Sequence, residues 1–250
     1  MAVRLQGTRA GRGPNPLVLH LHGGAFIGGD LDTGECFAQL LARAGGVVVS
    51  IAYPLAPAHP FPQAVEAAYA ALVWISEQRA RLAGARAPLF VAGEEAGGNL
   101  AAAVAAMARD RAEFTLAGQI LVTPMLDPCN AMPSQRKAVG EQVQCRWSEG
   151  WGAYLRGPMD AEHPYAVPAH AQRLARLPPA LVLAGEDDPM RDEAVAYAKR
   201  LQDAGIPVRT ALIPATGWPE SLEAPPHPCP CEAAVVEHLR AFLHAPEPAS

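Results

Sequence analysis

The stretch "PLFVAGEEAGGNL", residues 88–100, joins an apolar run to a run of small residues. Its apolar part, residues 89–93, predicts a buried strand. The alanine-rich residues that follow, 96–111, predict a helix. Between strand and helix the glycines bound a sharp turn with Glu95 at its apex. A charged residue therefore occupies a tight strand-to-helix turn, and its chemistry bears on what the chain can do.

Apolar runs alternate with segments of helical period along most of the chain, which is typical of βαβ units and a mainly parallel sheet. Between residues 127 and 178 this pattern gives way to proline-punctuated sequence that contains one short aromatic helix, 148–155. An insertion at the carboxyl edge of a parallel sheet usually forms a lid or a pocket wall. We therefore expect a single α/β domain over residues 1–250, with a small lid insertion at about 127–178. Strands are expected at 17–22, 47–53, 89–93, 119–125, 180–186 and 208–214, and helices at 64–82, 96–111, 190–204 and 232–244.

Composition excludes several classes of function. Half of the 250 residues are hydrophobic, 18% are charged and the formal net charge is −5, so nucleic acid and anionic membranes are poor candidates for partners. The N-terminal residues contain no apolar signal core, and no run reaches the roughly 18 apolar residues of a membrane span. The five cysteines are odd in number and irregularly spaced. They predict free thiols, a cytoplasmic location, and neither a metal site nor a cofactor.

Four motifs occur in a fixed order. They are "HGGAFIGGD" (22–30), "AYPLAPAHPFPQA" (52–64), "GEEAGGNL" (93–100) and "DPMRDEA" (188–194). Together they resemble the hormone-sensitive-lipase-like carboxylesterases of the α/β-hydrolase superfamily, from about residue 17 to the C-terminus. The passage "HPYAVPAH…LPPALVLAGEDDP" (163–189) also matches the family's lid-to-strand segment. The resemblance implies an α/β-hydrolase fold, with a mostly parallel central sheet flanked by helices. Only 21 residues precede the first motif, whereas the family usually carries extra N-terminal helices, so a truncated N-terminal cap is expected.

The same resemblance places the catalytic triad. The family reads Gly-Asp-Ser-Ala-Gly-Gly-Asn-Leu where this sequence reads "GEEAGGNL", so Glu95 stands at the position of the nucleophilic serine. The triad acid is kept as Asp188. The triad histidine should follow the last strand, where "PATGWPES" places Trp218. By this resemblance, two of the three triad members are replaced.

A second expected feature is an oxyanion hole. Adjacent glycines after a buried strand let backbone N–H groups turn into a cavity, where they can stabilise a developing negative charge. The expected donors are Gly23, Gly24 and Ala96. The expected pocket lining is His22, Phe26, Glu94, Trp147, Trp151 and Tyr154.

Ester hydrolysis by a triad needs a nucleophilic oxygen, an imidazole that moves its proton and a carboxylate that orients the imidazole. Trp218 cannot shuttle a proton, because its indole N–H is only a donor. The Glu95 carboxylate, at a helix N-terminus beside backbone donors, could fold into the oxyanion hole and occupy it. We therefore expect a pseudohydrolase with negligible activity on simple esters and a pocket for a small carbonyl or acyl compound.

Two alternatives stay open. Glu95 could act as a general base that removes a proton α to a carbonyl while the oxyanion donors hold the enolate, as in a lyase, an isomerase or a cyclase. Asp188, if close, would raise one pKa of the carboxyl pair. A weak carboxylesterase would need a relocated histidine, for which His227, His163 and His170 are the candidates.

A homodimer is also expected to be possible, since a missing cap would leave apolar surface to cover.

Overall fold

A parallel sheet with one antiparallel edge strand forms the centre of the protein. The computed structural model describes the chain apart from residues 10, 12, 130–131, 138–140, 215–230 and 246–250, and only the backbone of 141–145. Within this part, seven strands are ordered β1-β3-β2-β4-β5-β6-β7, and only β1 runs antiparallel to its neighbour, β3. The strands are β1 (Val3–Gln6), β2 (Leu17–Leu21), β3 (Val47–Ile51), β4 (Leu89–Glu94), β5 (Gly118–Val122), β6 (Ala180–Gly185) and β7 (Val208–Ile213).

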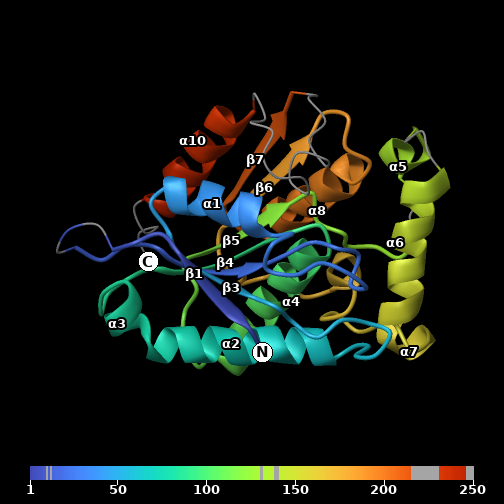
Figure 1. The fold of residues 1–250 in the computed structure, drawn as a ribbon. Coiled ribbons are helices and arrows are strands. Elements are labelled where there is room, and N and C mark those ends of the chain that lie inside the picture. Colours follow the sequence, from blue (N-terminus) through green and yellow to red (C-terminus); the bar gives the residue numbers. More distant parts are fainter. Residues whose placement is uncertain (10, 12, 130–131, 138–140, 215–230, 246–250) are drawn as a thin grey trace.

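Helices cover both faces of this sheet (Figure 1), so the central strands are buried along their whole length, the polar residues His20 and Ser50 included. On one face, α1 (Glu35–Arg43) and α10 (Glu232–Leu243) pack with strand side chains such as Val18 and Val48. On the other face, α2 (Gln63–Glu77), α4 (Ala96–Arg111) and α8 (Arg191–Asp203) pack with Leu17, Leu19 and their neighbours. The short helix α3 (Arg79–Leu82) follows α2. This is the expected α/β-hydrolase architecture.

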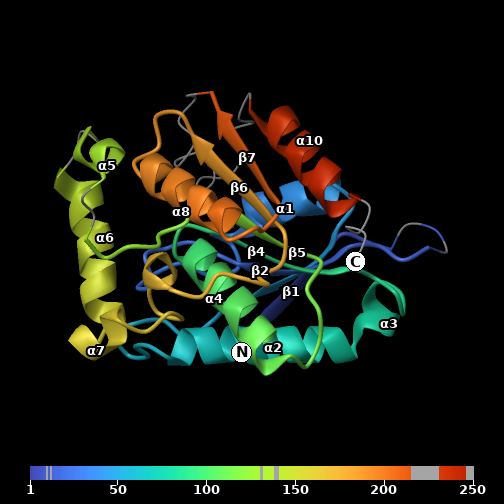
Figure 2. The ribbon, with the colours of Figure 1, turned by 180° about the vertical axis from the view of Figure 1, so that it is seen from behind.

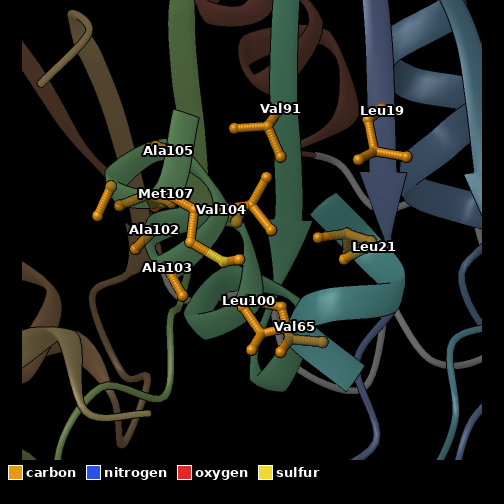
Figure 3. Packing of buried hydrophobic residues seen from close by; sticks show 14 of the residues in the cluster. Leu19, Leu21, Val65, Val91, Leu100, Ala102, Ala103, Val104, Ala105 and Met107 are labelled. Carbon is orange, nitrogen blue, oxygen red and sulfur yellow. The ribbon is translucent and has the colours of Figure 1, made fainter. Parts of the chain in front are cut away.

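Helix α4 is the innermost helix of the fold. Every residue from 96 to 108 is buried, because α4 packs against β4, β5 and β2 of the sheet and against α2. Figure 3 shows Leu100 and Val104 of α4 close to Val91 of β4 and Val65 of α2. Alanines and glycines fill most of its remaining positions, and their small side chains allow the close approach. The helix that carries the Glu95 turn is therefore fixed by packing on all sides.

The insertion after β5 stands beside the sheet as a separate column of helices (Figures 1 and 2). It contains α5 (Pro133–Lys137), α6 (Glu141–Tyr154), α7 (Pro158–Ala161) and the 3₁₀ helix η1 (Pro168–His170). The single short helix expected at 148–155 was wrong in extent, since α6 begins seven residues earlier, at Glu141. The missed residues, 141–147, are mostly polar, so they show too little apolar periodicity to indicate a helix.

Candidate active site

The turn between β4 and α4 holds Glu95 in a strained backbone conformation. Its φ of 51° and ψ of −116° lie where residues with a side chain are uncommon and where strain of about 1–3 kcal/mol is typical. Backbone bonds fix the turn: the Glu95 N–H donates to the Val122 carbonyl at 3.0 Å, and its carbonyl accepts from the Met125 N–H at 3.0 Å. Such a sharp strand-to-helix turn lifts its apex side chain out of the sheet.

Three N–H groups donate to the Glu95 carboxylate. Its Oε2 accepts from the backbone N–H of Gly24 at 2.6 Å and of Ala25 at 3.3 Å, and its Oε1 accepts from Trp147 Nε1 at 2.7 Å. The carboxylate therefore bridges the turn after β2 and helix α6 of the insertion. Glu95 as a whole residue is only partly buried.

The expected oxyanion donors take different partners. Gly24 donates to Glu95, whereas Gly23 donates to Glu94 Oε1 at 3.2 Å. No bond joins Ala96 to the Glu95 carboxylate in the described part of the chain, and the second backbone donor is Ala25 instead. Sequence reasoning missed Ala25 because its donor role depends on positive φ angles at Gly24 (119°) and Ala25 (51°), which only the folded turn reveals.

His22 holds this turn rather than pointing at Glu95. Its Nδ1 donates to the Gly23 carbonyl at 2.7 Å, and its ring stacks on Tyr53 with centroids 4.3 Å apart. The Tyr53 hydroxyl donates to the His22 carbonyl at 2.7 Å. Burial lowers the pKa of His22, so the ring is neutral at pH 7. The His22 ring is buried beneath the turn. Its assignment to the pocket lining stays a prediction.

Glu94 belongs to a buried polar chain that the sequence did not predict. Its Oε2 lies 2.9 Å from His20 Nε2, and His20 Nδ1 lies 2.8 Å from the Ser50 hydroxyl. All three residues are buried. A buried carboxylate needs such partners, and Glu94 uses its second oxygen to hold the Gly23 N–H. Two adjacent carboxylates, Glu94 and Glu95, thus fasten the turn after β2 to the end of β4.

The expected aromatic lining residues form a cluster between α6 and the turn after β2. The Phe26 ring stacks on Tyr154 at 4.0 Å and lies 5.0 Å from Trp151. Burial raises the pKa of Tyr154. These three rings are at most 3% exposed, so they bind the lid to the turn and leave Trp147 and Glu95 as the more accessible members. Helix α6 also comes very close at Gly150, where a Cβ atom would lie 2.1 Å from the Ala25 carbonyl oxygen.

The two remaining triad positions are those of Asp188 and Trp218. Asp188 follows β6, is buried, and accepts a bond from the Met190 N–H at 2.7 Å. Trp218 and His227 lie outside the described residues. The His163 ring lies at an angle against the rings of Phe61 and Tyr165, and His170 Nε2 lies 3.7 Å from Asp127 Oδ1. In the described part of the chain no histidine donates to or accepts from the Glu95 carboxylate.

The described cysteines are not all in the same oxidation state. Cys36 and Cys129 are free thiols, as expected, but Cys231 takes part in a disulfide. The expectation of free thiols was therefore wrong for Cys231. The described His, Cys, Asp and Glu side chains contain no group of three that could hold a metal ion. Within the same residues, every helix is too short or too polar to cross a bilayer.

A parallel sheet with a sharp strand-to-helix turn, a glycine turn facing it and a helical insertion above both defines the class of α/β hydrolases. Residues 18–217 match the family described as "alpha/beta hydrolase fold". The chain belongs to this family, and its relatives place it in the carboxylesterase branch. The resemblance inferred from the four motifs is thereby confirmed.

The similar proteins are mostly esterases. An esterase from Mycobacterium tuberculosis (strain ATCC 25618 / H37Rv) is 37% identical over 198 residues, which cover 77% of this chain and 62% of the relative. An arylesterase from Saccharolobus solfataricus is 36% identical over 77% of this chain and 64% of its own length. A gibberellin receptor from Oryza sativa subsp. japonica is 31% identical over 78% of this chain and 58% of the receptor. The chain thus spans less than two thirds of these relatives.

Solved structures agree with this assignment. A structure named "Bacterial Heroin Esterase" superposes with a TM-score of 0.85 and 31% identity, covering 97% of this chain and 80% of the other. An arylesterase structure gives a TM-score of 0.82 at 28% identity, with 96% of this chain and 79% of the other covered.

Proposed function

We propose that this chain is a catalytically altered member of the carboxylesterase branch, one that does not hydrolyse simple esters and keeps a pocket for a small carbonyl or acyl compound. The observation that carries the proposal is the 2.6 Å bond from the Gly24 N–H to Glu95 Oε2. The carboxylate occupies the backbone donors that a tetrahedral intermediate would need.

The electrostatic consequence opposes acyl transfer. A tetrahedral intermediate would place a second negative charge beside the Glu95 carboxylate. Two like charges about 4 Å apart repel by about 4 kcal/mol at an effective dielectric of about 20, enough to slow a reaction by roughly three orders of magnitude. By the family motif, the chain also has Trp218 where a histidine would relay the proton, and indole accepts no proton. One relative is named a receptor and not an esterase, the gibberellin receptor, so a binding role has a precedent among similar proteins.

Hydrolysis of short-chain p-nitrophenyl esters tests the proposal. We expect no turnover above background by the native protein or by the single variants Glu95→Ser and Trp218→His. Recovery in the double variant Glu95→Ser/Trp218→His would support an intact scaffold that lacks only its triad. Substantial turnover by the native protein, lost in Glu95→Gln, would overturn the proposal and favour a weak esterase with a relocated histidine such as His227.

A second function, proton abstraction by Glu95, has one observation in its favour. The carboxylate lies beside two backbone N–H groups that could hold an enolate. However, an ionised carboxylate has about four acceptor sites, and three are already taken by Gly24, Ala25 and Trp147. This leaves little capacity for a substrate proton, so we rank this function second. Glu95-dependent exchange of α-protons in D₂O would reverse the ranking. The cytoplasmic location and the homodimer stay predictions.

A further inference from the structure

Glu95 is held as a bound carboxylate ligand would be held. Both oxygens are used, and the donors come from two segments that are far apart in the sequence, the turn after β2 and helix α6. No Arg or Lys side chain of the described residues forms an ion pair with this carboxylate. Recognition therefore rests on N–H groups placed around a planar anion, which is a recurrent way of binding carboxylates.

The two backbone donors do not depend on Glu95 for their positions. Bonds from the Ile27 and Gly28 N–H groups to the Gly24 carbonyl, at 3.1 and 2.9 Å, close the turn. The Gly23 N–H is fastened separately to Glu94. Donors that are fixed before a ligand arrives cost no reorganisation on binding.

The indole donor is fixed independently as well. Helix α6 is anchored next to Trp147 by Gly150, which packs on the Ala25 backbone, and by the stack of Tyr154 on Phe26. The Tyr154 carbonyl also accepts a bond from the Phe61 N–H at 2.8 Å. Shortening the Glu95 side chain would thus leave three donors around a vacated carboxylate-sized space.

We propose that the N–H groups of Gly24, Ala25 and Trp147 form a receptor for a small monocarboxylate, with Glu95 as its resident ligand. This inference shares one premise with the proposed function, namely that the Glu95 carboxylate occupies the backbone donors. In the native chain the tethered carboxylate excludes free carboxylates, because its effective concentration is in the millimolar range or higher. Removing the Glu95 carboxylate opens the receptor to formate or acetate.

The test uses the full chain with Glu95→Ala, titrated with sodium acetate at constant ionic strength, with sodium chloride as the matched salt. We expect saturable changes in tryptophan fluorescence and in the thermal midpoint with acetate and no such response with chloride. The native protein should respond to neither salt. The double variant Glu95→Ala/Trp147→Phe should bind acetate about tenfold more weakly, since it lacks one charge-assisted hydrogen bond.

Glu95→Gly provides a second variant, because glycine accepts the positive φ at this position if alanine impairs folding. A folded Glu95→Gly or Glu95→Ala protein with no acetate response overturns the proposal. Equal responses to acetate and chloride also overturn it, as does an unchanged affinity after Trp147→Phe. Ester turnover by the native protein would refute the proposed function alone, because acetate binding to the variants is measured without turnover.

Discussion

Gly97 lies where α4 passes closest to the end of β2. A Cβ atom at this position would be 2.0 Å from the Leu21 carbonyl oxygen and 2.5 Å from that of His22. Both obstacles are backbone, so they cannot move aside without shifting the turn that holds the Glu95 carboxylate. The first glycine of "AGGNL" is thus a packing requirement at one specific contact.

We therefore expect Gly97→Ala to lower the free energy of unfolding by about 3 kcal/mol or more, as severe overpacking does. Urea denaturation measures this change. Gly152→Ala is the matched control, because a Cβ atom there meets nothing within 4 Å and the residue lies in helix α6. That control should be neutral or stabilise by up to about 1 kcal/mol. Equal stability of the two variants would contradict the argument.

The chain Ser50–His20–Glu94 makes a second prediction at single residues. Replacing His20 by leucine would leave the Glu94 carboxylate buried with one partner fewer. Removing a hydrogen-bond donor from a buried carboxylate leaves part of its desolvation cost uncompensated, typically about 1–3 kcal/mol or more, so we expect a loss of that size in urea denaturation. Ser50→Ala removes only the outer hydroxyl and should cost about 1 kcal/mol. A His20→Leu protein as stable as Ser50→Ala would show that the pair contributes little.

The sequence predicted the site only in part. Glu95 at the apex, and its tendency to occupy backbone donors, followed from residue type and position. The use of Ala25 followed from neither, since it depends on three successive positive φ angles, at Gly24, Ala25 and Phe26. Trp147 was expected as pocket lining, but its role as a donor depends on how α6 crosses the turn. Long-range contacts of this kind leave no local signal in the sequence.

At the scale of elements, Glu193 ties the lid to α8. Its Oε1 accepts from the N–H groups of Leu126 and Asp127, and its Oε2 accepts from Gln135 Nε2 at 3.0 Å. Burial raises the pKa of Glu193 to about 8, although the two backbone donors act in the opposite direction. The start of the insertion after β5 is therefore linked to a carboxyl group that titrates near neutral pH.

The sign of the pH dependence follows from the raised pKa. In the unfolded chain Glu193 releases its proton near pH 4.5, whereas the folded protein retains it up to about pH 8. Between these values the folded state binds more protons, so the free energy of unfolding falls as pH rises. We expect this fall to be smaller in Glu193→Gln, as measured by urea denaturation from pH 5 to pH 8. The exposed Glu186→Gln should keep the native profile, and identical profiles for all three proteins would refute the assignment.

Elements were predictable where local pattern and burial agree. The helix expected at 96–111 has those bounds in α4, because its alanines favour a helix locally and also fit the narrow space between β4 and α2. The helix expected at 64–82 divides into α2 and α3 around Gln78. Strand β1 and helix α1 were not predicted. Strand β1 is short and half exposed, and it is defined by pairing with β3 rather than by its own sequence.

At the scale of the whole molecule, the lid and the sheet domain differ in how they are held. Helix α4 is buried along residues 96–108, so its amides should exchange only when the protein unfolds globally. Helix α6 stands at the side of the molecule (Figure 1) and exposes Ser148, Glu149 and Gly152. Its attachment to the domain depends on a few contacts, among them the bond from Trp147 to Glu95. We therefore expect α6 to open at a lower free energy than α4.

Hydrogen exchange measures this difference directly. In the native protein, amides of residues 147–154 should exchange faster than those of residues 104–108. Trp147→Phe removes the bond to Glu95 and keeps an aromatic ring, so it should accelerate exchange in α6 about tenfold, the effect of about 1.4 kcal/mol. Exchange in α4 should stay unchanged, because residues 104–108 are buried within the sheet domain and are expected to exchange only on global unfolding. Equal acceleration in both helices would mean that the lid opens only with the whole domain, and the Glu95–Trp147 bond would then not act locally on the lid.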